Sequence, residues 1–276
     1  MKRIARVLLA ALGILLVSLF LFSGWKVYTI LHGYKAAERR YDSLADQMVS
    51  APSPAADPSA SEAFSVPEVS EAPQSEGKDP QAVVWEEYSP VAVDFNELHR
   101  LSGDVIAWIY LPDTVINYPI AQGADNDFYL TRFLDGTVTA GGTLFADCVC
   151  PSDFSGLNTI IYGHNMKNGS MFALIDDYAE QDFFEAHPVM YLNTPSQNYK
   201  VEIFSGFTTD PESFVYTSAF ASDEDYESFL RALLSSSEID CRTEVGSSDH
   251  IVTLSTCTYT AEDVRFVLCG KLTPIG

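Results

Sequence analysis

An uncharged apolar stretch near the amino terminus is the feature that most constrains this chain. Residues 7–25, VLLAALGILLVSLFLFSGW, carry no charged side chain, and Lys2, Arg3 and Arg6 precede them. A run of about 18 or more apolar residues is long enough to cross a bilayer as a helix. We therefore expect residues 1–6 to be a cytoplasmic amino terminus and residues 7–25 to be a transmembrane signal anchor.

A cleavable signal peptide is the alternative interpretation of this stretch. The apolar core of a signal peptide is usually shorter and ends in small residues, whereas this stretch ends in FSGW. The ending favours an uncleaved, single-pass anchor. Basic residues also follow the stretch, from Lys26 to Arg40, so charge alone defines its orientation poorly. The usual orientation places all later residues outside the cell.

The composition changes twice after the anchor. Residues 26–48 are expected to form a juxtamembrane segment that continues as a short helix. Residues 49–90 are rich in Ala, Pro, Ser and Glu, as in APSPAADPSASEA, and this composition buries too little apolar surface to offset the entropy of ordering. We expect a disordered stalk there and a folded catalytic domain over residues 91–276. A chain that lacks residues 1–85 is accordingly expected to be soluble and active.

Short β-prone runs separated by turn residues fill the rest of the chain. Their spacing is typical of a mainly antiparallel barrel or sandwich. The predicted strands are Val105–Tyr110, Val115–Ala121, Gly142–Ala146, Asn158–Tyr162, Val189–Leu192, Tyr199–Phe207, His250–Thr258 and Val264–Leu272.

Three helices are predicted among these strands. Phe95, Leu98 and Leu101 share one face of a short helix at the start of the domain. A second helix is expected to begin at Ser170, which is a suitable N-cap. A third covers residues 222–237, where acidic residues crowd the first turn and favour the helix dipole.

Charge and cysteine content exclude several classes of function. The formal net charge is −22, and because nucleic-acid binding depends largely on cations, we expect no nucleic-acid partner. The five cysteines are an odd number and too sparse for a disulfide scaffold. Cys148 and Cys150 with the distant His164 are poor evidence for a zinc site, so we expect no metal and no cofactor.

The run TLSTCTYTAEDVR, residues 253–265, brings a cysteine and an arginine together. Strand alternation places Thr253, Ser255 and Cys257 on one face, so the cysteine points away from the apolar face that carries Leu254. If the turn centres on Ala261, Cys257 and Arg265 face each other across a hairpin, with Cβ atoms about 5 Å apart.

A guanidinium at that distance would lower the pKa of the thiol and could stabilise an oxyanion. Two ordinary interpretations stay open. Cys257 could be a buried structural cysteine, and Arg265 could form a surface ion pair with Glu262 or Asp263.

A general base is the third group that such chemistry requires. His164 follows the β-branched run NTIIYG, at the point where a strand opens into a polar loop. Reactive side chains commonly occupy such loops on a rigid scaffold. A structural role for a single loop histidine is the alternative.

Taken together, YGHNM, TLSTC and the arginine eight residues after the cysteine resemble the sortases, and specifically class B. The segments INYPIAQGADNDFYL, GGTLFAD, YGHNMKNGSMFALIDDY and IVTLSTCTYTAEDVRFVLCGKL occur in family order and cover most of residues 94–272. The resemblance implies a mainly β fold, a closed β-barrel with an amino-terminal helix and a helix before the cysteine strand.

The resemblance also implies an activity. Sortases are membrane-anchored cysteine transpeptidases of Gram-positive bacteria, with the catalytic domain outside the cell. They cleave a carboxyl-terminal sorting signal of secreted proteins after threonine, and they transfer the thioacyl group to a cell-envelope amine such as lipid II or a pilin lysine. By motif, Cys257 would be the nucleophile, His164 the acid and base, and Arg265 the oxyanion stabiliser. The candidate substrate-binding residues are Ser255, Thr256, Tyr162 and Asn165.

Two other functions are weighed against this one. A cell-wall cysteine peptidase would use the same groups but only hydrolyse its substrate. In papain-like enzymes the cysteine usually precedes the histidine and begins a helix, whereas here His164 precedes Cys257, which lies on a predicted strand. A non-enzymatic, stalked wall protein is the other alternative, and it would bury Cys257 completely.

Overall fold

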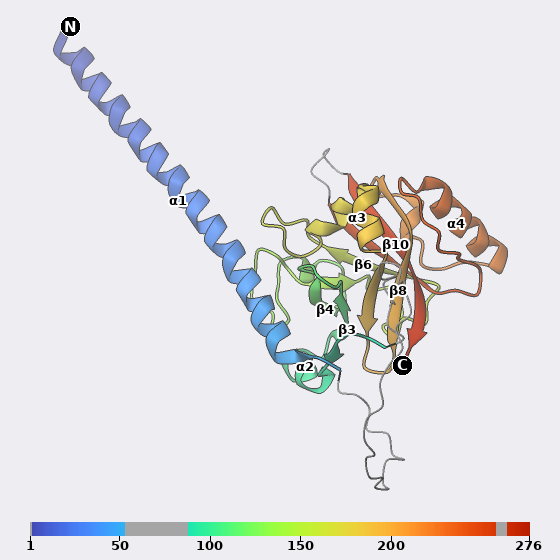
Figure 1. The fold of residues 1–276 in the computed structure, drawn as a ribbon. Coiled ribbons are helices and arrows are strands. Elements are labelled where there is room, and N and C mark those ends of the chain that lie inside the picture. The colour runs from blue at the N-terminus through green and yellow to red at the C-terminus, as the bar shows by residue number, and fades with distance from the viewer. Residues whose placement is uncertain (1, 53–87, 258–263) are drawn as a thin grey trace, which may run out of the picture.

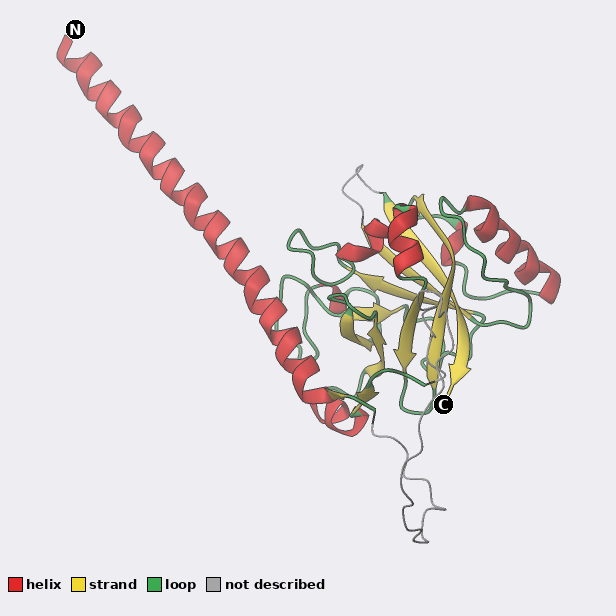
Figure 2. Cartoon of the chain, viewed as in Figure 1, coloured by secondary structure: helices red, strands yellow, loops and turns green. Residues whose placement is uncertain are grey.

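A closed β-barrel forms the body of the molecule (Figure 1). The computed structural model describes residues 2–52, 88–257 and 264–276. For residues 2–10 and Cys257 it describes the backbone only. Helices surround the barrel, and a long helix projects from one side of it (Figure 2). The predicted mainly β, closed-barrel fold with an amino-terminal helix is confirmed.

Eight strands close the barrel in the order β10-β8-β7-β3-β4-β5-β6-β9. Most neighbours are antiparallel, whereas the pairs β4–β5 and β6–β9 are parallel. The parallel pair β6–β9 brings the carboxyl ends of both strands to the same edge of the barrel. The strands are β3 (Val105–Tyr110), β4 (Asn117–Ala121), β5 (Leu144–Ala146), β6 (Asn158–Gly163), β7 (Val189–Asn193), β8 (Asn198–Thr209), β9 (Ile251–Cys257) and β10 (Arg265–Ile275).

The helices lie around the barrel, and side-chain hydrogen bonds cap the first turn of two of them. The Asp94 carboxylate accepts a hydrogen bond from the Glu97 backbone N–H, and the Ser222 hydroxyl accepts one from Asp225. The helices are α1 (Lys2–Met48), α2 (Phe95–Leu101), α3 (Gln181–Ala186) and α4 (Asp223–Ser236), and the 3₁₀ turns are η1 (Phe128–Leu130), η2 (Ala173–Ala179) and η3 (Phe214–Tyr216). Helix α4, which precedes the cysteine strand, confirms that part of the prediction.

The helix predicted to begin at Ser170 is wrong in its start and in its type. Met171 has a φ of 58°, which an α-helix cannot accommodate, and the chain then forms the 3₁₀ turn η2. Tertiary hydrogen bonds explain the difference. The Met171 N–H donates to the Tyr118 hydroxyl and the Phe172 N–H donates to the His164 carbonyl, and these bonds hold the segment in the non-helical conformation with Met171 at positive φ.

Strand β9 lies between two hydrophobic cores. Val252 and Leu254 belong to the core inside the barrel, whereas Ile251 belongs to a second core between the barrel and α4. The polar face of the strand is covered as well, since Thr253 and Ser255 are 0% and 3% exposed. The polar side chains of such a covered strand must form their hydrogen bonds within the protein.

Helix α1 is continuous through the predicted anchor and the juxtamembrane segment. Among the described residues it is the helix long and apolar enough to cross a membrane, and its apolar side chains from Leu12 to Leu31 are exposed. Its last turns pack on the domain, where Tyr41, Leu44 and Met48 join the core inside the barrel. The expectation that residues 1–85 are dispensable is therefore revised.

A two-stranded sheet closes the junction between α1 and the domain. Strand β1 (Val49–Ser50) pairs with β2 (Ala92–Val93), and the Asp94 N–H donates to the Met48 carbonyl. The predicted stalk therefore does not begin at residue 49, because the backbone hydrogen bonds of β2 order Val49 and Ser50. The rest of that prediction, residues 53–87, lies outside the described residues. Since the two flanks of residues 53–87 are paired, α1 connects the predicted anchor directly to the domain.

Candidate active site

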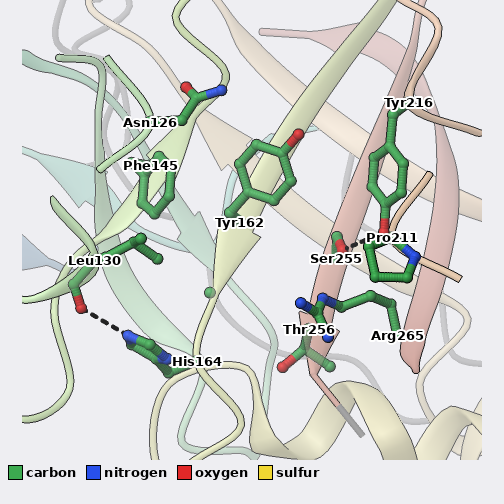
Figure 3. Close-up of a pocket in the computed structure, with 11 residues that line it drawn as sticks. Asn126, Leu130, Phe145, Tyr162, His164, Pro211, Tyr216, Ser255, Thr256 and Arg265 are labelled. Atoms are coloured by element: carbon green, nitrogen blue, oxygen red, sulfur yellow. Dashed lines mark hydrogen bonds between the residues drawn. The ribbon is translucent and has the colours of Figure 1, made fainter. Parts of the chain in front are cut away.

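A pocket of about 280 Å³ opens at the edge of the barrel where β6 and β9 end. Figure 3 shows His164 and Arg265 on different sides of this pocket, with Tyr162, Ser255 and Thr256 between them. The described lining residues are Asn126, Leu130, Phe145, Tyr162, Gly163, His164, Pro211, Tyr216, Ser255, Thr256 and Arg265.

Strand register brings the three predicted catalytic residues to this edge. Gly163 pairs with Thr256 across the parallel strands β6 and β9. His164 directly follows Gly163 in the sequence, and Cys257 directly follows Thr256. Neighbouring strands lie about 4.8 Å apart, so the two backbones leave the sheet side by side. On the other side of β9, Arg265 pairs directly with Cys257, which confirms the predicted hairpin register. The side chain of Cys257 lies outside the described residues.

His164 is held by a backbone carbonyl. Its Nε2 atom lies 2.6 Å from the Leu130 oxygen (Figure 3). A carbonyl can only accept, so Nε2 carries a hydrogen, and Nδ1 is the nitrogen that can take or give a proton at the reaction centre. The residue before His164 must be a glycine in this packing, because a Cβ at position 163 would lie 2.5 Å from side-chain atoms of both Leu144 and Phe172.

Arg265 is half-buried and lines the pocket. Its Nη1 donates to the Val264 carbonyl at 3.3 Å, and Figure 3 shows the side chain extending toward Thr256. The alternative ion pair with Glu262 or Asp263 involves residues outside those described. A guanidinium beside the end of β9 is able to donate hydrogen bonds to an anionic group near the backbone of Cys257.

Tyr162 and Tyr216 form an aromatic wall of the pocket. Their rings stack with centroids 6.2 Å apart. The Tyr162 hydroxyl donates to the Asp147 carboxylate at 2.9 Å, and the Tyr216 hydroxyl lies 3.0 Å from Ser255 Oγ. Burial, followed by the bond to Asp147, raises the pKa of Tyr162 above its ordinary value, so this hydroxyl stays protonated at neutral pH.

Thr256 presents an unusual buried hydroxyl. The residue is 1% exposed, and within the described part of the chain its Oγ1 has no hydrogen-bond partner. An unpaired buried hydroxyl is unfavourable, by about 1–3 kcal/mol. Its place in the pocket lining makes a bound peptide a suitable partner.

Asn165 does not line this pocket. Its amide donates to the Asp176 carboxylate at 2.6 Å, and the residue borders a separate cavity of about 610 Å³. Its role in substrate binding stays a prediction. Conversely, sequence reasoning missed Leu130, which acts through its backbone oxygen, and Tyr216, which reaches the pocket from the 3₁₀ turn η3. No sequence motif identifies either contact.

The described residues contain no cluster of three or more His, Cys, Asp or Glu side chains that could hold a metal ion. The cysteines Cys148, Cys150, Cys241 and Cys269 are free thiols. Burial raises the pKa of Cys241 and Cys269 to about 12, and it also raises the pKa of Cys150, so these side chains are poor nucleophiles and metal ligands at neutral pH.

Comparison with known proteins extends these observations. The Sortase domain family model matches residues 109–273. The chain is 37% identical over 182 residues to sortase B of Listeria monocytogenes, covering 65% of this chain and 74% of the relative. It is 31% identical over 189 residues to sortase B of Staphylococcus aureus, covering 67% and 77%. This chain belongs to the class B sortases.

The fold agrees with that membership. A crystal structure of Staphylococcus aureus sortase B superimposes with a TM-score of 0.63 at 30% identity, covering 66% of this chain and 87% of that one. The same relative has been solved as a substrate complex, and a sortase B has been solved with triglycine. Class B sortases are cysteine transpeptidases that anchor surface proteins, so this chain is a transpeptidase of that kind.

Proposed function

We propose that this class B sortase cleaves the sorting signal of a secreted protein after threonine, with Cys257 as nucleophile, His164 as acid and base, and Arg265 as oxyanion stabiliser. The observation that carries the proposal is the register of β6, β9 and β10. It aligns Gly163 with Thr256 and Arg265 with Cys257, so all three groups reach one edge of the barrel beside the pocket.

The first half-reaction is acyl transfer to sulfur. The Cys257 thiolate attacks the threonine carbonyl carbon, and the charge that develops on oxygen is stabilised by the Arg265 guanidinium. His164 gives the proton of Nδ1 to the departing amine as the C–N bond breaks. The acyl group then remains on sulfur as a thioester, and the carboxyl-terminal part of the signal leaves with the new amine.

The second half-reaction runs in the opposite sense. His164 Nδ1 removes a proton from an incoming amine, which attacks the thioester carbon. The C–S bond breaks, Cys257 returns as a thiolate, and a new amide bond joins the surface protein to the acceptor. Triglycine in the solved sortase B complex supports an amine acceptor here, and lipid II or a pilin lysine are the two acceptor classes proposed.

Substrate recognition is proposed to involve Tyr162, Ser255 and Thr256. All three line the pocket and come from β6 and β9, which also deliver the catalytic groups. The substrate complex of the Staphylococcus aureus relative supports a peptide in this position. The Thr256 hydroxyl would gain there the partner that it lacks among the described residues.

The enzyme is proposed to be a single-pass protein of the cell membrane, with its catalytic domain outside the cell. The exposed apolar side chains of residues 11–25 of α1 support a lipid environment for the predicted span, because no described residue of the domain covers them. At about 1.5 Å per residue, Tyr41 lies roughly 24 Å along the helix axis from Trp25. The docked barrel would therefore stand close to the outer surface of the bilayer.

Covalent capture of the acyl intermediate tests the assignment. The full chain in detergent is incubated with a library of peptides that contain candidate sorting signals, and intact-mass and peptide-level spectrometry locate the adduct. We expect a thioester on Cys257 with the peptide cut after threonine, and none in Cys257→Ala. Adding triglycine or a lysine peptide should convert the adduct into an amide product. An adduct on another cysteine would contradict the assignment, and hydrolysis alone at all amine concentrations would contradict acyl transfer.

A further inference from the structure

The docked end of α1 reaches the backbone that supports His164. Tyr41 is 3% exposed, and its hydroxyl donates to the Gly142 carbonyl at 2.5 Å. The same hydroxyl lies 3.0 Å from Thr143 Oγ1, which in turn donates to the Arg132 carbonyl. A single side chain of the membrane-proximal helix thus fixes the backbone between η1 and β5.

Gly142 packs directly against the carbonyl that holds the histidine. Its φ is +56°, and a Cβ at this position would lie 2.5 Å from the oxygens of Tyr129 and Leu130. The Leu130 oxygen is the atom that accepts the hydrogen bond from His164 Nε2. A shift of Gly142 would therefore move the partner of the imidazole, because the two backbone segments leave no space between them.

A second series of contacts connects Tyr41 to the backbone of the histidine. The Tyr41 ring meets the Tyr118 ring edge-on, with centroids 5.4 Å apart. The Tyr118 hydroxyl accepts from the Met171 N–H, and the next residue, Phe172, donates to the His164 carbonyl at 3.0 Å. Both the ring and the main chain of His164 are thus supported by segments that contact Tyr41.

Other contacts provide the attachment of the helix itself. Arg40 forms an ion pair with Asp135, and its guanidinium stacks 3.7 Å from the centroid of the Phe133 ring. Leu44 and Met48 are buried in the core inside the barrel. Loss of the Tyr41 hydroxyl alone leaves all of these contacts in place, so the helix should stay docked.

We propose that Tyr41 is a positioning residue for His164, and that the docked end of α1 thereby couples the membrane anchor to the acid–base group of the active site. The inference rests on the proposed catalytic role of His164. Its physical basis is that the imidazole has one backbone partner, Leu130, and the position of that partner depends on Gly142, which Tyr41 holds.

The test uses the full chain in detergent micelles and compares Tyr41→Phe with Tyr28→Phe. Tyr28 lies on the same helix, is 64% exposed and has its ring beside His32 of that helix, so it is a matched control. Because small misplacements of a catalytic group can cost up to about 100-fold, we expect the kcat of Tyr41→Phe to fall about tenfold with KM within about twofold. Tyr28→Phe should behave as the wild type.

A spectroscopic signature separates positioning from mere stabilisation. In ¹⁵N spectra of histidine-labelled protein, at a pH where the ring is neutral, wild-type His164 should show the tautomer with hydrogen on Nε2. Tyr41→Phe should show a mixture of tautomers. A lowered melting temperature with unchanged kcat and an unchanged tautomer would overturn the proposal. If Tyr41→Phe does not fold, Tyr118→Phe, which removes only the acceptor of the Met171 N–H, is expected to show a smaller loss of kcat, and normal kcat in that variant would overturn the proposal.

Failure of the catalytic assignment would give a different result. His164→Gln should lose nearly all turnover if His164 is the acid and base. If that variant keeps its activity, the role of His164 is wrong. The coupling between α1 and His164 is then tested by the tautomer of the His164 imidazole alone. A changed tautomer in Tyr41→Phe supports the coupling, and an unchanged tautomer overturns it.

Discussion

Arg265 is the direct cross-strand partner of Cys257, at the first residue of β10 and the last residue of β9. Directly opposed residues of antiparallel strands have Cβ atoms about 5 Å apart, which puts a guanidinium within reach of a thioester oxygen. The pairing depends on only one hairpin, so it is insensitive to the rest of the fold. It also makes the arginine the easiest of the proposed groups to test.

Arg265→Lys should retain the positive charge but lose most of the activity. An ammonium cannot supply the planar fork of donors, and removal of one oxyanion donor costs about 10²–10³ in kcat in other enzymes. We expect a fall of that order in steady-state transpeptidation. Arg231→Lys, at an exposed position on α4, is the control. Turnover near that of the wild type would remove Arg265 from the chemistry.

Thr256→Val should make the protein more stable and less active. The substitution keeps the shape of the side chain and removes a buried hydroxyl that has no partner among the described residues, which should raise the free energy of unfolding by about 1 kcal/mol. If the hydroxyl binds the peptide, KM should rise about tenfold, as expected for one lost hydrogen bond of about 1.4 kcal/mol. Chemical denaturation and initial-rate kinetics measure the two effects.

Thr159→Val is the matched control for this experiment. Thr159 is also fully buried on β6 and also lacks a described partner for its hydroxyl, but it does not line the pocket. It should gain stability without any change in KM. A similar loss of activity in both variants would show that the pocket hydroxyl has no specific role.

Alkylation should be selective for Cys257 and should depend on pH. The pKa of Cys241 and Cys269 is raised to about 12 by burial, so the neutral thiol persists there until strongly alkaline pH. Because the thiolate is the reactive form, these residues should not react with iodoacetamide below about pH 10. Peptide mass spectrometry in a Cys148→Ala background measures the selectivity, since Cys148 is half-exposed. Preferential labelling of Cys241 or Cys269 at neutral pH would contradict this prediction.

Two deletions should differ in their effect on the stability of the domain. Removing residues 1–85 also removes Tyr41, Leu44 and Met48 from the core, and each large buried apolar side chain contributes about 1.5–3 kcal/mol. We expect thermal denaturation to show a loss of several degrees or more. Replacing residues 53–87 by a short Gly/Ser linker should leave the melting temperature unchanged, because β1 and β2 remain paired. Equal stability of the two deletions would contradict the docking of α1.

Strand positions were predictable because they depend on local chemistry. Val105–Tyr110 is a short, continuous apolar run rich in β-branched and aromatic residues, as in a largely buried strand, and the structure has β3 over the same residues. The capped helix that follows Ser222 was predictable for the same reason. The Cys257–Arg265 register followed from the length of one turn. The motifs around His164 and Cys257 indicated the family, although the roles of those residues stay proposals.

By itself the sequence determined the apolar stretch near the amino terminus, the barrel strands and the family, since apolar patterns and short motifs act over neighbouring residues. Only the tertiary structure decided that Met171 leaves the helical region, that the polar face of β9 is covered, and that α1 docks on the barrel. Each of these depends on partners distant in the chain: Tyr118 for Met171, Tyr216 for Ser255 and Gly142 for Tyr41. Such contacts leave no local pattern, because the free energy of burial and hydrogen bonding depends on which surfaces the closed barrel brings together.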